Sequence, residues 1–308
     1  MKDRLNKILL LAEPLYDKYK SIADSRYGRL IRMSSYHVYF LLFLPTWCAI
    51  WMVDEGQDWF HRSLLSLIFA LGAFLTRSAG CIINDIADIK FDRQVERTNG
   101  RPLVTGEVKI SEAVTLAVIM SGLALVILMF LPSRVLYVGI VAAIMTVVYP
   151  LSKRFTNCPQ LILGFTFNLG VVMAWLTLSD SHLFQLAMLY IGFSMLTFAY
   201  DTIYACQDIE YDKEAGVKSF PLFIQSQGRH SIKDVVWHLY KLSFTGIGIA
   251  GLGMGMGSSF YLSLGGAIYI LSNSLDICNI EDPQSCSDHF KKISLVLVII
   301  FLGIAFGR

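Results

Sequence analysis

Long apolar segments separated by short polar ones make up the chain from residue 36 to its end. Nine of these segments approach the roughly 20 residues that a helix needs to cross the hydrocarbon core of a bilayer. They cover residues 36–53, 61–83, 112–131, 134–150, 159–178, 183–206, 235–255, 258–277 and 290–307. The pattern predicts an all-α polytopic membrane protein with nine transmembrane helices in one domain over residues 36–308. Residues 1–35 are polar and basic, and we expect them to form an amphipathic cytoplasmic segment.

Composition supports this fold class. The chain is 55% hydrophobic and 16% charged, whereas soluble proteins are about 45–50% apolar and about 25% charged. The net charge of +2 gives no reason to expect a nucleic-acid partner, and we expect no obligate protein partner either. The six cysteines are scattered without metal-ligand spacing, so we expect them to be small packing residues.

Lysine and arginine predict the orientation of the helices in the membrane. With the N-terminus in the cytoplasm, 21 of the 26 basic residues fall in cytoplasmic segments. Only Arg62, Arg134 and Arg308 fall on the other side. Basic residues concentrate in cytoplasmic loops of membrane proteins, so nine spans with the C-terminus outside are expected.

Two acidic stripes follow the second and sixth spans. The first contains Asn84, Asp85, Asp88 and Asp92, and the second contains Asp201, Tyr204, Asp208 and Asp212. On a regular α-helix each set falls on one face. A carboxylate at mid-membrane depth costs roughly 2.5–3.5 kcal/mol, and neighbouring like charges repel. Two such stripes therefore predict a strongly positive ligand between them.

A weak internal repeat bears on the sidedness of the stripes. A shift of 116 residues superposes Asp85 on Asp201 and Asp92 on Asp208, and a shift of 120 superposes Asp88 on Asp208. Either offset indicates a repeat of about four helices. Because four is even, both stripes are predicted to reach the cytoplasmic side and to face each other across one cavity. An inverted-repeat transporter needs an odd number of spans per unit.

Carboxylate spacing favours Mg²⁺ as the positive ligand. Asp88 with Asp92, and Asp208 with Asp212, place oxygen donors one helical turn apart. Mg²⁺ takes one or two carboxylates per ion and completes its shell with water and substrate phosphate. A plainer interpretation, that these are solvated helix-end aspartates, suits one pair better than two matched stripes.

Basic residues follow each stripe and suit a diphosphate. Arg97 and Arg101 come after the first stripe, Lys218 after the second, and Lys153 and Arg154 between the fourth and fifth spans. Arginine binds phosphate oxygens in a bidentate manner and lysine acts as a mobile charge, although the bias toward cytoplasmic cations would also place them here. Arg77 lies deep in the second span, which predicts an internal partner: an acidic group of the protein or a substrate carboxylate.

The longer sequence context resembles the UbiA-type intramembrane prenyltransferases. The first motif runs from Arg77 through Asn84, Asp85, Asp88 and Asp92 to Arg97-Thr98 and Arg101-Pro102-Leu103. The second runs from Asp201 through Asp208 and Asp212 to Gly216-Val217-Lys218-Ser219. A third segment, Tyr149-Pro150-x-x-Lys153-Arg154-x-Thr156-x-x-Pro159-Gln160-x-x-Leu163-Gly164, resembles the branch that prenylates 4-hydroxybenzoate for ubiquinone synthesis.

The resemblance implies a nine-helix bundle around a central cavity open to lipid, Mg²⁺ as the cofactor, and polyprenyl diphosphate and 4-hydroxybenzoate as substrates. It implies three sets of roles on this chain. Metal and diphosphate would be bound by Asn84, Asp88, Asp92, Asp208 and Asp212, and diphosphate also by Arg97, Arg101, Lys153 and Lys218. Asp201, with Asp85 and Tyr204, would act in catalysis. Arg154, or as second choice Arg77, would bind the benzoate carboxylate.

One segment departs from the family pattern, and other functions remain open. The early motif resembling Arg-x-Asp-Arg/Lys-Pro-Ile-Gly is replaced by Arg32-Met33-Ser34-Ser35-Tyr36-His37-Val38, without the acid, proline and glycine. Alternative acceptors are homogentisate, a naphthoate, haem or a lipid alcohol, and a cation-coupled transporter is a non-enzymatic alternative. A bacterial inner membrane with the active site facing the cytoplasm is favoured over the mitochondrial inner membrane.

Overall fold

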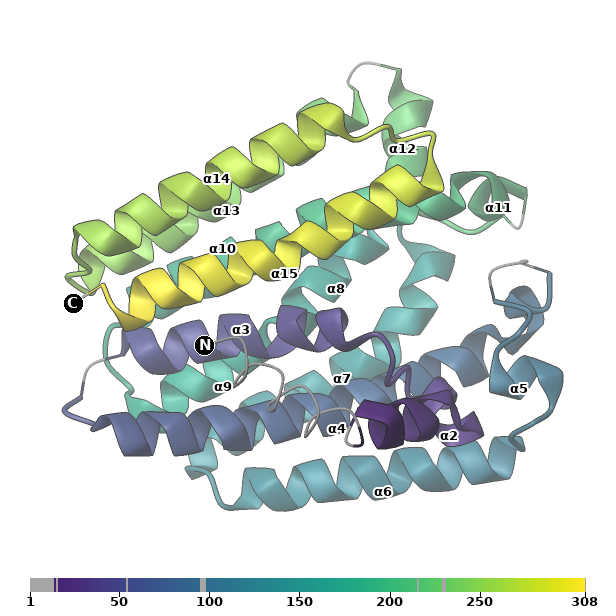
Figure 1. The fold of residues 1–308 in the computed structure, drawn as a ribbon, viewed down its shortest axis with the longest axis horizontal. Helices are drawn as coiled ribbons and strands as arrows, with labels where there is room; N and C mark the ends of the chain where they lie inside the picture. The colour runs from purple at the N-terminus through teal and green to yellow at the C-terminus, as the bar shows by residue number, and fades with distance from the viewer. Residues whose placement is uncertain are drawn as a thin grey trace. The chain divides into compact units, whose positions relative to one another are not determined.

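The computed structural model describes residues 14, 16–53, 55–94, 98–214, 216–228 and 231–307. Every regular element in this part of the chain is a helix (Figure 1). The helices are α2 (Arg26–Leu30), α3 (Tyr36–Met52), α4 (Trp59–Asp92), α5 (Pro102–Thr105), α6 (Ile110–Met129), α7 (Ser133–Phe155), α8 (Pro159–Phe167), α9 (Leu169–Leu178), α10 (Leu183–Ala205), η1 (Cys206–Asp208), α11 (Ile209–Glu214), α12 (Phe220–Gln227), α13 (Ile232–Gly253), α14 (Ser258–Ile277) and α15 (Pro283–Ala305).

A helix, or for residues 159–178 the pair α8 and α9, coincides with each predicted span. Within the described residues, five helical stretches are both long and apolar enough to cross a membrane. They are Trp59–Asp92, Ile110–Met129, Ser133–Phe155, Pro159–Leu178 and Leu183–Glu214, and His37–Met52 is a shorter apolar helix. The all-helical membrane fold is therefore confirmed, and nine spans with a cytoplasmic N-terminus stay a prediction.

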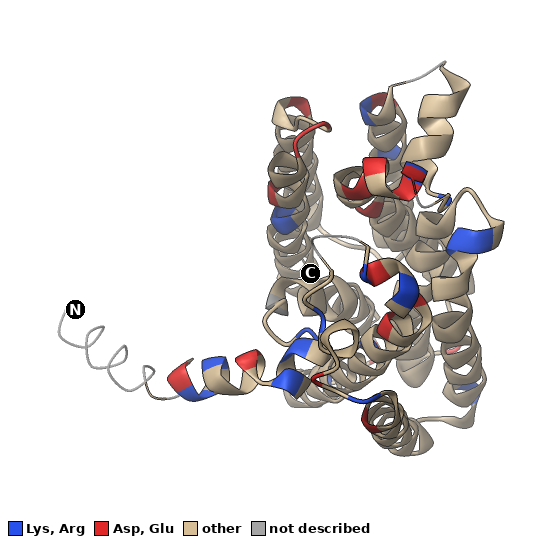
Figure 2. Cartoon of the chain, turned by 90° about the vertical axis from the view of Figure 1, so that its right-hand side faces the viewer, with Lys and Arg blue, Asp and Glu red and all other residues tan. Residues whose placement is uncertain are grey.

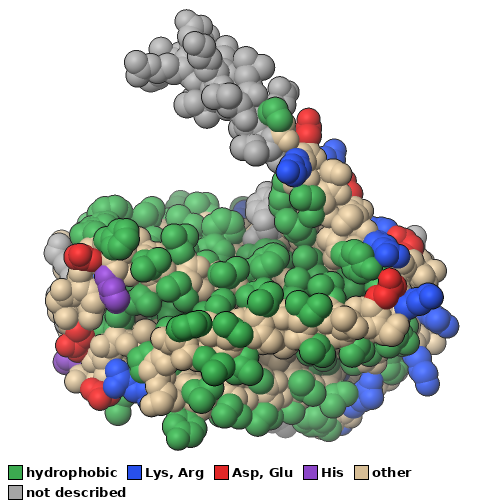
Figure 3. All heavy atoms as spheres, turned by 90° about the horizontal axis from the view of Figure 1, so that it is seen from below, with side chains coloured by type: hydrophobic (Ala, Val, Ile, Leu, Met, Phe, Trp, Pro, Cys, Tyr) green, Lys and Arg blue, Asp and Glu red, His purple; other side chains and the backbone are tan. Residues whose placement is uncertain are grey.

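The surface has the character of a lipid-facing one. Phe130 is 86% exposed and Leu262 is 76% exposed, and hydrophobic side chains cover much of the face shown in Figure 3. Most of the helical length carries neither acidic nor basic residues (Figure 2). Water would penalise so much exposed apolar surface, whereas lipid tails solvate it.

The chain forms two compact units. The first contains residues 1–36 and 75–122, and the second contains residues 37–74 and 123–308. In the first unit, α2 is held against the segment between α5 and α6 by the pair Arg29–Glu107, and against the first turn of α6 by the pair Arg26–Glu112. The predicted N-terminal segment up to residue 13 lies outside the described residues.

The second unit is built around α10, which packs against α13 and α8, while α14 packs against α15. Lipid is as apolar as leucine, so helix association in a membrane depends on close packing rather than on the hydrophobic effect. Gly192 and Gly246 permit this: a Cβ added at Gly246 would lie 2.9 Å from the Met188 carbonyl oxygen and 3.2 Å from the Gly192 Cα.

The fifth predicted span is broken at Asn168, between α8 and α9. The buried Asn168 Nδ2 donates to the Gly164 and Phe193 carbonyls and to Thr197 Oγ1. These bonds fasten the break to α10, so it is a fixed part of the second unit.

Candidate functional site

The first acidic stripe lies on the last turns of α4, where Asn84, Asp85, Asp88 and Asp92 follow one another as predicted. Asp85 and Asp92 are buried, and Asn84 and Asp88 are half-buried. The stripe therefore has an inner pair and an outer pair of oxygen donors. All four belong to the first unit.

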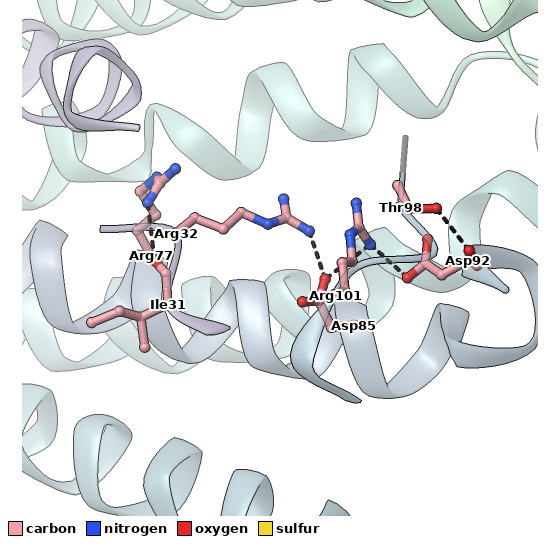
Figure 4. Close-up of polar contacts among 7 residues, drawn as sticks. All are labelled: Ile31, Arg32, Arg77, Asp85, Asp92, Thr98 and Arg101. Atoms are coloured by element: carbon pink, nitrogen blue, oxygen red, sulfur yellow. Dashed lines mark hydrogen bonds and ion pairs between the residues drawn. The ribbon is translucent and has the colours of Figure 1, made fainter. Parts of the chain in front are cut away.

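Arg101 bridges the two buried carboxylates (Figure 4). Its Nη1 lies 3.0 Å from Asp85 Oδ1 and 2.5 Å from Asp92 Oδ2. One guanidinium thus separates two like charges that would otherwise repel across the same helix face. Thr98 Oγ1, which donates to the Asp92 carbonyl at 3.0 Å, fixes the segment that leads to Arg101.

Arg32 also pairs with Asp85, with its Nη2 2.6 Å from Asp85 Oδ1 (Figure 4). The backbone of Arg32 has φ = 55°, in the left-handed region that non-glycine residues seldom adopt. The segment that begins at Arg32 lacks the acid, proline and glycine of the family motif, which on sequence grounds left a role to Arg32 alone. Asp85, which is 2% exposed, is therefore an ion-pair partner of two arginines, and its catalytic role stays a prediction.

Arg77 is buried, as its depth in the second span predicted. Its Nη1 donates to the Ile31 carbonyl at 3.5 Å, next to Arg32 (Figure 4). Arg77 thus contacts the turn from which Arg32 reaches Asp85.

The second stripe belongs to the second unit and is not one regular helix. Asp201 and Tyr204 lie on α10, Asp208 ends the 3₁₀ segment η1, and Asp212 lies on α11. A 3₁₀-helix advances about 120° per residue rather than about 100°, so one regular α-helix does not carry all four residues, and a face shared by all of them stays a prediction. Two side-chain hydrogen bonds lie at this 3₁₀ segment. Cys206 Sγ donates to the Thr202 carbonyl at 3.3 Å, and Gln207 Nε2 donates to the Tyr204 carbonyl at 3.1 Å.

Lys153 and Lys218, which are far apart in the sequence, come together in the second unit. Lys153 lies in the last turn of α7, and its positive charge acts on Asp201 of α10. The backbone N–H of Lys218 donates to the Lys153 carbonyl at 3.1 Å. Arg154 is the next residue on α7 and is exposed. The backbones of two predicted diphosphate-binding lysines are thus hydrogen-bonded to each other, and the charge of one of them, Lys153, acts on the predicted catalytic Asp201.

Aromatic rings from α10 and α15 pack together along the part of α10 that carries Asp201. Phe290 on α15 lies 4.5 Å from the Tyr204 ring and 5.5 Å from the Tyr200 ring, measured between centroids. Ring faces can stabilise a nearby cation. Tyr204 was predicted from the sequence and Phe290 was not, because nothing in the apolar pattern of the last span distinguishes the residue that reaches α10.

These contacts test neither which residues bind a metal ion nor whether the two acidic stripes face one cavity. Arg97 lies outside the described residues. Among the residues that are described, no three acidic, histidine or cysteine side chains gather as a metal site. Mg²⁺ does not require such a cluster, because one or two carboxylates per ion suffice when substrate phosphate completes the shell. Carboxylate and amide oxygens one turn apart on α4 fit that chemistry. Because the stripes belong to different units, their meeting across one cavity stays a prediction.

Comparison with known proteins places these features in a family. Residues 42–298 match the model of the UbiA prenyltransferase family. The chain is 38% identical over 240 residues to a protein of Legionella pneumophila (strain Paris) named 4-hydroxybenzoate octaprenyltransferase. That match covers 72% of this chain and 84% of the relative.

Two solved structures share the fold. The apo structure of a UbiA homolog from Aeropyrum pernix K1 superposes with a TM-score of 0.74 at 20% identity, covering 88% of this chain and 98% of the other. A UbiA homolog from Archaeoglobus fulgidus, bound to GPP and Mg²⁺, gives a TM-score of 0.60 at 18% identity, covering 92% of this chain and all of the other. On the family match and the identity to its relatives, the chain belongs to the UbiA prenyltransferase family.

Proposed function

We propose that this protein transfers a polyprenyl group from a polyprenyl diphosphate to the ring carbon ortho to the hydroxyl of 4-hydroxybenzoate, releasing diphosphate, as a step of ubiquinone biosynthesis. The observation that carries this proposal is the identity to the Legionella pneumophila relative, whose name states the acceptor. The segment from Tyr149 to Gly164, which resembles the same branch, supports it independently of the two acidic stripes.

Mg²⁺ is the cofactor we propose, held by Asn84, Asp88 and Asp92 from one stripe and by Asp208 and Asp212 from the other. Oxygen donors one turn apart suit this ion, and the Archaeoglobus fulgidus homolog was solved with Mg²⁺ and a prenyl diphosphate. The bound ion would neutralise negative charge that develops on the departing diphosphate.

The protein's own cations would share that task. Lys153 and Lys218 meet at the end of α7, and we assign them to the diphosphate together with Arg97. Arg101 contacts Asp85 and Asp92, which places it at the first stripe. We assign it to the diphosphate oxygens there as well. Donors placed in advance where charge develops lower the barrier to C–O cleavage without reorganising during the reaction.

Asp201 would accept the hydrogen bond or proton of the phenol, which makes the ortho carbon a better nucleophile. Tyr204, in ring contact with Phe290, would shield the allylic cation from water. The acceptor carboxylate would be bound by Arg154, on the turn that carries Lys153, or by the buried Arg77. The protein would act in a bacterial inner membrane, with this site open to the cytoplasm.

Product analysis with a panel of acceptors tests the proposal. Membranes containing the protein are incubated with Mg²⁺, mixed polyprenyl diphosphates and one acceptor at a time, and the products are identified by mass spectrometry. We expect a prenylated 4-hydroxybenzoate with equimolar pyrophosphate. Homogentisate, a naphthoate, haem and a lipid alcohol should give little product, because none presents a benzoate carboxylate para to a phenol.

Two results would contradict this assignment. Preferred prenylation of another acceptor would keep the protein in the family and change its substrate. Absence of pyrophosphate release from purified protein with every acceptor would favour the transporter alternative. Membranes carrying the Asp88→Ala variant provide the background level of endogenous activity.

A further inference from the structure

Gln160 is a buried polar residue to which the proposed reaction gives no task. It is the second residue of α8 and is 5% exposed. Its Oε1 accepts the backbone N–H of Phe220 at 3.0 Å. A buried amide at such a position needs its hydrogen bond, because leaving a buried polar group unpaired costs about 1–3 kcal/mol.

The bond from Gln160 supplies a cap that α12 otherwise lacks. Phe220 is the first residue of α12, and the N-cap residue Ser219 makes no side-chain hydrogen bond to the helix. Within the described part of the chain, the Ser219 hydroxyl is buried without a hydrogen-bond partner. The first N–H groups of a helix have no partner inside it, so Gln160 caps α12 from a different helix.

The loop that leads into α12 carries Lys218 and is tied to its surroundings by backbone bonds. Val217 N–H donates to the Asp212 carbonyl at 2.9 Å, and Lys218 N–H donates to the Lys153 carbonyl at 3.1 Å. The Lys218 side chain is exposed, so side-chain packing does not fix its position. The two backbone bonds and the Gln160 cap fix the backbone from which this side chain extends.

The segment from Tyr149 to Gly164 holds Gln160 itself in place. Thr156 Oγ1 accepts the Cys158 N–H at 3.1 Å, and Pro159 begins α8. A Cβ added at Gly164 would lie 2.4 Å from the Ser194 carbonyl oxygen of α10. The start of α8 is therefore held in place by its turn and by close packing against α10, and this holds Gln160 next to the loop that leads into α12.

We propose that Gln160 is a positioning residue that keeps Lys218 beside Lys153, so that both ammonium groups act on one diphosphate. The identity of the ligand, a diphosphate, rests on the proposed function. The hydrogen bonds that hold the loop do not depend on that function. Lys153 and Gln160, seven residues apart, hold the same loop at neighbouring points. The seven-residue spacing thus lets one segment carry a diphosphate-binding lysine and also hold the loop that carries the other.

The test compares Gln160→Met, which keeps the volume and removes the acceptor, with Gln225→Met, an exposed glutamine on α12. Hydrogen exchange is measured by mass spectrometry on the full chain in lipid nanodiscs. We expect the peptide covering residues 216–222 of Gln160→Met to exchange about tenfold faster than wild type, as expected when a capped N–H loses its partner. The control variant should match wild type.

Steady-state kinetics supplies the second readout. In Gln160→Met, KM for a short-chain prenyl diphosphate should rise about tenfold while kcat changes less than about threefold, the signature of lost binding rather than lost chemistry. Gln160→Glu keeps an acceptor oxygen and should restore the exchange protection of residues 216–222. Unchanged exchange of that peptide in Gln160→Met, or a fall in kcat at constant KM, would overturn the proposal. If wild type releases no pyrophosphate, the proposed function fails and the exchange result still decides whether Gln160 holds the loop.

Discussion

Replacing Asp88 by alanine should lower kcat/KM for prenyl transfer by about 10²–10³-fold, the loss typical of removing one preorganised electrostatic contact to a developing charge. Asp88 lies half-buried on α4 between the two buried carboxylates that Arg101 bridges. Asp88 is one of the carboxylates that we assign to Mg²⁺, so its removal should weaken binding of the ion to the first stripe. Pyrophosphate release by purified protein at saturating Mg²⁺ measures the effect.

A matched aspartate controls for nonspecific effects. Asp180 has an exposed side chain and pairs with Arg134, so Asp180→Ala should retain wild-type activity. The melting temperature of Asp88→Ala should stay close to that of wild type, because its carboxylate is only half-buried. Comparable prenylation by Asp88→Ala, or by wild type without added Mg²⁺, would refute the role of the metal.

The second large effect is expected at Asp201. Asparagine at this position keeps the volume and the hydrogen-bonding shape but cannot take a proton, so kcat should fall about 10²–10⁴-fold, the range for a lost general base. The affinity for the prenyl diphosphate should change little, because Lys153 and Lys218 remain in place. Single-turnover product formation and binding of an unreactive donor analogue separate the two quantities.

Glu210→Gln provides the matched charge removal, since Glu210 is exposed on α11. It should leave kcat unchanged. A wild-type kcat in Asp201→Asn would show that the phenol does not depend on this carboxylate, and weakened donor binding with normal chemistry would assign Asp201 to the diphosphate side instead.

The sequence predicted most of the helical architecture, because helix length and apolar composition are properties of local segments. The ranges 258–277 and 159–178 coincide with α14 and with α8 and α9 together. The break at Asn168 was not predicted, since its cause is a set of hydrogen bonds to α10. The 3₁₀ turn at Cys206–Asp208 was missed for a related reason, because periodicity assumes one helix type throughout.

Candidate site residues could be predicted where acidic residues recur in the sequence at the spacing of one helical turn. Asn84, Asp85, Asp88 and Asp92 lie together on α4 as expected. Partners contributed by distant segments were not predictable: Arg32 reaches Asp85 from 53 residues away, and Gln160 reaches Phe220 from 60. Such contacts depend on how helices pack, which a single sequence does not specify by pattern alone.

The most direct test of the central claim, that both acidic stripes bind one Mg²⁺-bound diphosphate, is a double-mutant cycle on donor binding. The affinity of an unreactive prenyl thiolodiphosphate is measured by calorimetry, with and without Mg²⁺, for wild type, Asp88→Asn, Asp208→Asn and the double variant. One shared ligand predicts that each single change removes most of the Mg²⁺-dependent affinity and that the double change falls short of additivity by about 1–3 kcal/mol, as interacting sites do. Additive losses, or full affinity without Mg²⁺, would show that the stripes do not act on the same ion-bound diphosphate.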